Sequence, residues 1–549
     1  MKTAVTIYDT TLRDGAQAEG INFSVADKLH IAHRLDSFGV HYIEGGWPGS
    51  NQKDIEFFQR AKEIKFAHAK LAAFGSTRRA KTKVEEDPQV AALVDSAAPV
   101  ITLVGKTWLL HVIEVLNTTA EENLAMIGDT VRYLRSLGRE VIYDAEHCFD
   151  GFKDAPDYAL SCLRTAAEAG ASYIVLCDTN GGTMPSDVLR ITAKIKETLA
   201  DTGVQVGIHT HDDCGLGVAN ALAAVSAGAT QVQGTINGYG ERTGNCNLIT
   251  LMAALQLKLN IPVVPEESMR RLRELSLFVD GVANQRYNIR APFVGVTAFS
   301  HKGGLHVNAI NKVAHSYEHI KPELVGNKQH VLVGELSGRT NVMLKAKQLD
   351  LELDEKSPET KQILDTIKQL ENEGYEFEAA DASFELLVRR QLQKREAFFE
   401  LQEYHVSIRK SQLHNYDTCE ATIKLIIDGE KVYTVAEGDG PVNALDAALR
   451  QALSKHYHSI QHIRLTDYKV RILDSDTGTA AKTRVLIEST DGVETWTTVG
   501  VSFDIIEASW RALQDSVEYK LIKEHDGVPV KLKRFFSHLA HDGMEKFSK

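Results

Sequence analysis

The segment VGIHTHDDCGLG at 206–217 places His209 and His211 one residue apart, followed by two aspartates and a glycine-flanked turn. Residues i and i+2 of a β-strand point to the same side, so the pattern predicts both imidazoles on one face where a strand ends. Two neutral imidazoles on one face are half of a metal site, and a hydrogen-bonded pair of core histidines is the structural alternative. A third ligand, and a scaffold that brings it close, decides between the two.

The first 250 residues alternate between short β-rich runs and longer amphipathic segments such as 24–39 and 155–170, both of which end in glycine. Eight such units, about 30 residues apart, predict a (β/α)8 barrel of the α/β class rather than an open doubly wound sheet. The predicted strands are 4–9, 42–47, 71–76, 100–105, 140–146, 173–179, 206–212 and 231–238.

In such a barrel the functional residues gather just after the strands, at the C-terminal mouth. The first strand runs into YDTTLRDGAQ, so Arg13 and Asp14 reach the mouth. Because barrel closure makes the seventh, eighth and first strands neighbours, Asp14, His209 and His211 are expected to converge. One carboxylate and two imidazoles leave open positions on a metal, as a catalytic site needs.

A fourth donor is expected from the loop after the eighth strand. Asn245 is the preferred candidate there, and the thiol of Cys246 is a softer alternative. Oxygen ligands predict Mg²⁺ or Mn²⁺, whereas imidazole equally suits Zn²⁺, Co²⁺ or Fe²⁺.

Composition narrows the possible partners and the compartment. The chain has 549 residues and a net charge of −12, which argues against nucleic acid or an anionic membrane as a partner. The N-terminal residues show no apolar signal region, and no apolar run is long enough to span a membrane. The six cysteines are scattered, which fits free thiols and predicts a cytoplasmic protein.

The pattern changes after the barrel. We expect a catalytic barrel domain at 1–265, helical linker subdomains at 266–397 and a C-terminal domain at 398–549. Segments 422–453 and 483–513 share an order of strands, glycine-bearing turn and amphipathic helix. Two β-β-α repeats of this kind predict a compact α+β domain with pseudo-twofold symmetry.

Three motifs identify a resemblance. YDTTLRDGAQ, HTHDD and NGYGERTGNCNL, in this order on a predicted barrel, resemble the DRE-TIM metallolyase superfamily. The whole chain is similar to its Claisen-condensing branch, which includes 2-isopropylmalate, homocitrate and citramalate synthases. YIEGGWPGSN at 42–51 and YDAEHCFDGFK at 143–153 resemble the citramalate synthase lineage most.

The resemblance implies an acyltransferase of the EC 2.3.3 class that condenses acetyl-CoA with a 2-oxo acid, which is pyruvate in this lineage. Water then cleaves the thioester, and the products are CoA and citramalate, a precursor of 2-oxobutyrate and isoleucine. The implied metal polarises the ketone, and Arg13 both binds the substrate and stabilises the oxyanion.

Other roles also come from the resemblance. His306 in HKGGLHVNA is the implied base, with His301 as a second candidate, and Glu146 holds that base. Thr179 is an implied contact of the substrate carboxylate, and Glu44 is a candidate substrate contact because its position faces the barrel. The structural alternatives are a solvated His306, a turn-forming Thr179 and a buried structural Glu44.

The resemblance further implies a homodimer and a C-terminal regulatory domain. Exchange of His306 between the two chains is what the resemblance implies, and a site built within one chain is the alternative. A branched-chain amino acid, isoleucine first, is the implied effector, and a domain that only dimerises is the alternative. The turns EGDGPVN at 437–443 and VGVSFD at 499–504 could take its carboxylate at helix N-termini. The candidate effector residues are Gly438, Asp439, Gly440, Val501 and Ser502.

Competing functions remain. The same chemistry on 2-oxoisovalerate gives 2-isopropylmalate, and on 2-oxoglutarate it gives homocitrate, which needs an extra cation that no strand end obviously supplies. A barrel metal hydrolase of the amidohydrolase type also uses HxH, but after the first strand. An amino-acid sensor without catalysis is disfavoured by intact Arg13, Asp14, His209 and His211.

Overall fold

The chain divides into two compact units in a computed structural model. The first unit comprises 1–299 and 319–329, and the second comprises 300–318 and 330–549. The structure describes residues 4–301, 309, 313–331, 339–349, 351, 353–354, 357–377, 379–392, 398–411, 416–473 and 480–527.

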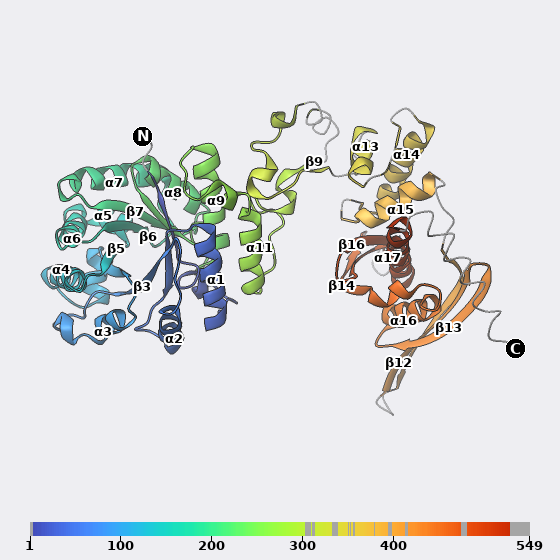
Figure 1. The fold of residues 1–549 in the computed structure, drawn as a ribbon, viewed down its shortest axis with the longest axis horizontal. Helices are drawn as coiled ribbons and strands as arrows, with labels where there is room; N and C mark the ends of the chain where they lie inside the picture. Colours follow the sequence, from blue (N-terminus) through green and yellow to red (C-terminus); the bar gives the residue numbers. More distant parts are fainter. Residues whose placement is uncertain are drawn as a thin grey trace. The chain divides into compact units, whose positions relative to one another are not determined.

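A closed barrel of eight parallel strands forms the first unit, which confirms the predicted fold (Figure 1). The strands follow one another in sequence order, and β8 pairs with β1 in the register Thr6 with Gln231. The strands are β1 Thr6–Asp9, β2 Tyr42–Gly46, β3 Lys70–Ser76, β4 Val100–Lys106, β5 Glu140–Glu146, β6 Tyr173–Asp178, β7 Gln205–Thr210 and β8 Gln231–Gly234.

Helices surround the barrel (Figure 1). Helix α1 illustrates how local sequence sets the ends of a helix. Ser24 and Asp27 form a capping box at its start, and Gly39, with φ 93°, ends it. The helices are α1 Val25–Phe38, α2 Gln52–Ala61, α3 Pro88–Asp95, α4 Ala120–Ser136, α5 Cys148–Asp154, α6 Pro156–Glu168, α7 Pro185–Thr198, α8 Gly217–Ser226, α9 Leu248–Ala253, α10 Glu266–Met269 and α11 Leu272–Val282.

Two layers of buried side chains hold the barrel together. A large apolar cluster joins strands and outer helices, with Ile7 and Leu103 among its fully buried members. A smaller cluster consists of strand residues and includes Tyr8, Tyr42 and Val100. The stacked rings of Tyr8 and Tyr42, with centroids 5.7 Å apart, are part of the packed interior typical of this fold.

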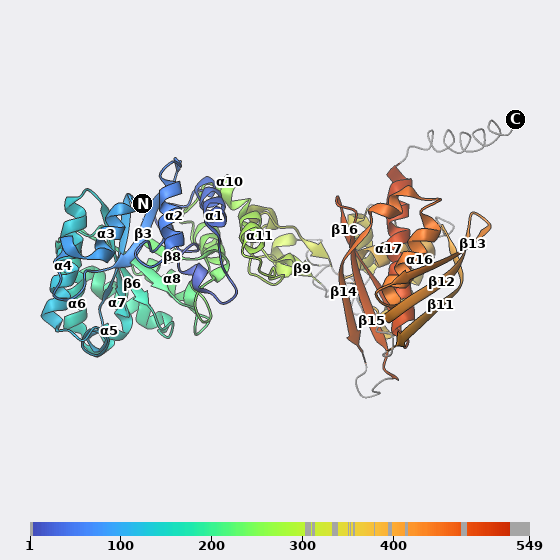
Figure 2. The ribbon, with the colours of Figure 1, turned by 90° about the horizontal axis from the view of Figure 1, so that it is seen from below.

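The second unit carries a repeated α+β arrangement. Each repeat has a three-stranded antiparallel sheet followed by a helix. The sequence predicted two strands and a helix for each copy, so the structure adds one strand before them. Figure 2 shows α16 and α17 between the two sheets. The elements are β11 Glu400–Ser411, β12 Tyr416–Ile427, β13 Glu430–Gly438 and α16 Pro441–Leu453, then β14 Arg464–Ile472, β15 Thr483–Thr490, β16 Thr495–Ser502 and α17 Ile505–Gly527.

Short elements precede these repeats in the second unit. Helix α15 packs against α17, where Arg390 forms ion pairs with Asp515 at 2.8 Å and Glu518 at 2.5 Å. The domain limits at 265 and 397 stay predictions. The elements are β9 Ser300–His301, β10 His330–Val331, α13 Arg339–Gln348, α14 Pro358–Asn372 and α15 Asp381–Gln391.

Among the helices that the structure describes, none combines the length and the apolar composition that crossing a bilayer requires.

Candidate metal and substrate site

A cavity of about 600 Å³ opens at the C-terminal ends of the barrel strands. Six of the residues singled out in the sequence line it, and they lie at or just after the ends of four different strands, β1, β5, β6 and β7. These residues are Arg13, Asp14, Glu146, Thr179, His209 and His211.

Asp14, His209 and His211 lie together in this cavity. Nε2 of His209 is 3.3 Å from Oδ2 of Asp14 and 3.3 Å from Nε2 of His211. One potential ligand atom from each residue lies within 4.8 Å of the others, and all three residues are buried. His209 is the penultimate residue of β7, and His211 follows the strand in a bridge with Asn245.

The donor set fits a divalent metal ion. Burial would raise the pKa of Asp14, but Arg13 and the hydrogen bond with His209 hold it well below its ordinary value. Burial and the nearby His209 lower the pKa of His211 to about 3. Asp14 is therefore a carboxylate and His211 a neutral imidazole at pH 7, which are the forms that bind metals.

Asn245 lies next to the three potential metal ligands. Its Nδ2 donates to Oδ2 of Asp14 at 2.9 Å, and its Oδ1 is buried with no hydrogen-bond partner among the described residues. That oxygen is available as a further ligand. Cys246 lies outside the cluster, and burial raises the pKa of its thiol to about 12, so it remains protonated.

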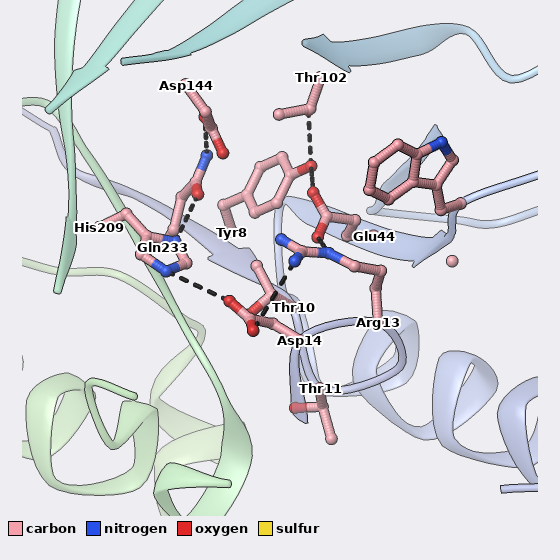
Figure 3. Close-up of polar contacts among 12 residues, drawn as sticks. Tyr8, Thr10, Thr11, Arg13, Asp14, Glu44, Thr102, Asp144, His209 and Gln233 are labelled. Carbon is pink, nitrogen blue, oxygen red and sulfur yellow. Dashed lines mark hydrogen bonds and ion pairs between the residues drawn. The ribbon is translucent and has the colours of Figure 1, made fainter. Parts of the chain in front are cut away.

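Arg13 is held from several sides (Figure 3). Its Nε donates to Oε1 of Glu44 at 2.6 Å, its Nη1 lies 3.7 Å from Oδ1 of Asp14, and its guanidinium lies 3.8 Å from the centre of the Phe74 ring. Glu44 is fully buried, and its Oε2 accepts from the hydroxyl of Tyr8 at 2.6 Å. Both oxygens of Glu44 are thus occupied, which favours a positioning role over substrate contact.

Glu146 and Thr179 line the cavity on the side of β5 and β6. Glu146 forms an ion pair with Lys106 at the end of β4. The hydroxyl of Thr179 accepts from the backbone N–H of His147 at 2.9 Å, so its own proton can point to a bound substrate.

Several polar residues around the site were not predicted from the sequence. Oε1 of Gln233 lies 2.8 Å from Nδ1 of His209, and Nε2 of Gln233 donates to Asp144 at 2.9 Å (Figure 3). Tyr8 and Lys106 were also missed. The sequence signal that could have identified them is a polar side chain at a position of an otherwise apolar strand that faces the barrel interior.

The predicted base is not tested by the described residues. His306 is outside the described residues. His301, the second candidate, is in β9 of the second unit, where its Nε2 is 3.6 Å from Oε1 of Glu318.

The predicted effector residues occupy equivalent places in the two C-terminal repeats. Gly438, Asp439 and Gly440 join β13 to α16, and Val501 and Ser502 end β16 before α17. Val501 is buried in a cluster with residues of α13, α14 and α15.

Known proteins match the chain over nearly its whole length. An (R)-citramalate synthase of Aquifex aeolicus is 53% identical over 96% of this chain and 99% of its own. An (R)-citramalate synthase of Geobacter sulfurreducens is 51% identical over 95% of this chain and 98% of its own. The chain belongs to the citramalate synthase family.

Domain models agree with this membership of the citramalate synthase family. An HMGL-like model matches residues 4–279, a homocitrate synthase post-HMGL domain-like model matches 293–375, and a LeuA allosteric (dimerisation) domain model matches 378–521. A probable 2-isopropylmalate synthase of Methanopyrus kandleri is 31% identical over 93% of this chain and 97% of its own. The chain is thus much more similar in sequence to these citramalate synthases than to this 2-isopropylmalate synthase.

Proposed function

We propose that this enzyme condenses acetyl-CoA with pyruvate and water to give (R)-citramalate and CoA. The identity of more than half of the residues over the full length of an (R)-citramalate synthase carries the proposal. The cavity supports it, because a carboxylate, two imidazoles and a guanidinium surround one small space. The product feeds the synthesis of 2-oxobutyrate and isoleucine.

Asp14, His209 and His211, together with Oδ1 of Asn245, would hold a divalent metal, with Mg²⁺ or Mn²⁺ preferred for the oxygen ligands. A divalent ion bound there would supply Lewis-acid polarisation of the ketone of the 2-oxo acid. The guanidinium of Arg13, which faces the same cavity, neutralises the charge that develops on the ketone oxygen. Thr179 donates its hydroxyl proton to the substrate carboxylate.

His306 removes a proton from the methyl group of acetyl-CoA, and the resulting carbon nucleophile attacks the ketone carbon. Glu146, which lines the cavity and pairs with Lys106, is proposed to orient this base. Water then attacks the thioester carbonyl, and the C–S bond breaks to release CoA. Loss of the thioester makes the condensation irreversible.

The test is CoA release, measured with a thiol reagent. Purified enzyme with Mg²⁺ or Mn²⁺ and acetyl-CoA is given pyruvate, 2-oxobutyrate, 2-oxoisovalerate and 2-oxoglutarate in turn. We expect the highest kcat/KM with pyruvate and loss of turnover with a chelator. A preference for 2-oxoisovalerate would make the enzyme a 2-isopropylmalate synthase, and no turnover with any acid would refute the reaction.

The C-terminal unit is proposed to bind isoleucine at the turns 438–440 and 501–502 and to form a homodimer. The match to a LeuA allosteric (dimerisation) domain supports both roles. Isoleucine should lower kcat/KM in a titration, with leucine and valine as controls. Equal activity at all concentrations of the three amino acids would leave dimerisation as the only role, and a mass of 60.7 kDa in sedimentation would contradict the dimer.

The enzyme is proposed to work in the cytoplasm, where its six free thiols would stay reduced.

A further inference from the structure

Gln233 is a fully buried polar side chain near the end of β8. It contacts two residues from other strands: its Oε1 is 2.8 Å from Nδ1 of His209, and its Nε2 is 2.9 Å from Oδ1 of Asp144 (Figure 3). These three side chains form a chain of hydrogen bonds that joins β5, β8 and β7. Its end is one of the proposed metal ligands.

The direction of the bonds follows from chemistry. Burial raises the pKa of Asp144 to about 7, and its Oδ1 accepts from Nε2 of Gln233 in the structure. A carbonyl-type Oδ1 accepts in the ionised and in the protonated acid alike, so the NH₂ group of the Gln233 amide faces it. The carbonyl end of the same amide then faces His209 and also accepts, so Nδ1 of His209 carries a proton. A histidine binds a metal as the neutral imidazole, and in that form the proton on Nδ1 leaves Nε2 with a free lone pair. In the metal-free site Nε2 faces the carboxylate of Asp14 at 3.3 Å, so any proton there is the one that the metal replaces.

That lone pair points into the proposed metal site. Nε2 of His209 is the atom that lies 3.3 Å from Asp14 and 3.3 Å from His211. We propose that Gln233, oriented by Asp144, is a positioning residue that fixes His209 in the Nδ1–H tautomer and so presents Nε2 to the metal. The inference rests on the proposed metal site and not on the identity of the 2-oxo acid.

The two histidines are unequal in this respect. Nδ1 of His211 is buried and has no hydrogen-bond partner among the described residues. No comparable chain of bonds selects its tautomer in that part of the structure. In the metal-free protein the tautomer of His209 is therefore fixed by hydrogen bonds, whereas that of His211 is not. A substitution of Gln233 should change the tautomer of His209 alone.

The test measures Mn²⁺ binding to the metal-free full-length enzyme by isothermal titration. We expect Gln233→Leu to weaken binding about 10–100-fold, as loss of an outer-shell partner does. Gln231→Leu is the matched control, because Gln231 is a fully buried glutamine of the same strand whose amide makes no hydrogen bond to the described residues. Its Mn²⁺ affinity should equal that of the wild type.

A second measurement reports the tautomer directly. Nitrogen-15 NMR of histidine-labelled, metal-free enzyme should show His209 protonated at Nδ1 in the wild type and a mixture of tautomers in Gln233→Leu. A structural role alone would lower stability without this change. A wild-type His209 that carries a proton on Nε2 and none on Nδ1 would overturn the proposal.

A double variant guards against a fold defect in Gln233→Leu. Asp144→Asn combined with Gln233→Glu keeps an acceptor next to Nδ1 of His209 and a donor behind it, so Mn²⁺ affinity should stay near that of the wild type. Unchanged affinity in Gln233→Leu, or a double variant as weak as a folded Gln233→Leu, would refute the positioning role. Absence of Mn²⁺ binding in the wild type would instead refute the metal site.

Discussion

At the scale of single residues, Arg13 combines contacts that only a guanidinium can make together. Its planar group lies over the Phe74 ring while Nε donates to Glu44 and Nη1 faces Asp14. An ammonium group has neither the fork of donors nor the flat surface for stacking. The position is thus specific for arginine and not merely for positive charge.

Arg13→Lys is expected to lower kcat about 100-fold, the loss typical when one donor to an oxyanion is removed. Steady-state CoA release measures it. Arg34→Lys is the matched control, because Arg34 also pairs with a glutamate, Glu274 at 3.1 Å, and lies 4.9 Å above an aromatic ring, that of Phe278. Equal losses in both variants would contradict a specific role for Arg13.

At the scale of elements, the last turn of α1 fixes the chain that enters β3. The carboxylate of Asp36 accepts the backbone N–H groups of Ala67, His68 and Ala69, each at 2.8 Å. Burial would raise the pKa of Asp36, but these three donors outweigh it and hold the pKa below its ordinary value. The ionised form therefore stabilises the barrel.

The sign of this effect gives a prediction about pH. Because the pKa is lower in the folded than in the unfolded protein, the stabilisation is complete above the unfolded pKa of about 4 and is lost as the pH falls through the folded value. Asp36→Ala should lower the free energy of unfolding by about 1–3 kcal/mol at pH 7, and by less at low pH. Urea unfolding at several pH values measures it.

Ser37→Ala is the control for Asp36→Ala, since Ser37 follows it in α1 and its hydroxyl donates only to the exposed carbonyl of Arg34. A change within about 0.5 kcal/mol is expected for it. If the loss of unfolding free energy in Asp36→Ala did not depend on pH, the charge of the carboxylate would not be the source of the stabilisation.

At the scale of the whole molecule, each unit has an apolar core of its own. Leu103 of β4 is fully buried in the barrel core, and Leu449 of α16 is fully buried in the core of the C-terminal repeats. Separate cores of this size normally unfold as separate cooperative transitions.

Leu103→Ala and Leu449→Ala form a matched pair, since both remove the same atoms from a fully buried site. Each should destabilise its own unit by about 2–5 kcal/mol. Differential scanning calorimetry should show two transitions, with a different one shifted in each variant. One shared transition that moves in both variants would refute independent unfolding.

The extent to which the sequence predicts this structure depends on the range of the interactions. Strand and helix periodicity follows from neighbours a few residues apart, and β5 at Glu140–Glu146 coincides with its prediction. The end of β8 was predicted at 238 but lies at Gly234, because Asn237 adopts φ 61° and turns the chain away. A strand ends where its partner in the sheet ends, which one segment does not reveal.

The sequence alone thus determined the barrel, the order of its strands and the convergence of Asp14, His209 and His211 at its mouth. Periodicity encodes the elements, and barrel closure leaves one place for residues that follow the strands. Only the tertiary structure decided what each side chain touches: the bond between Gln233 and Asp144 spans 89 residues of sequence. Such contacts depend on which inward-facing side chains meet across the closed barrel, and no local pattern encodes that meeting.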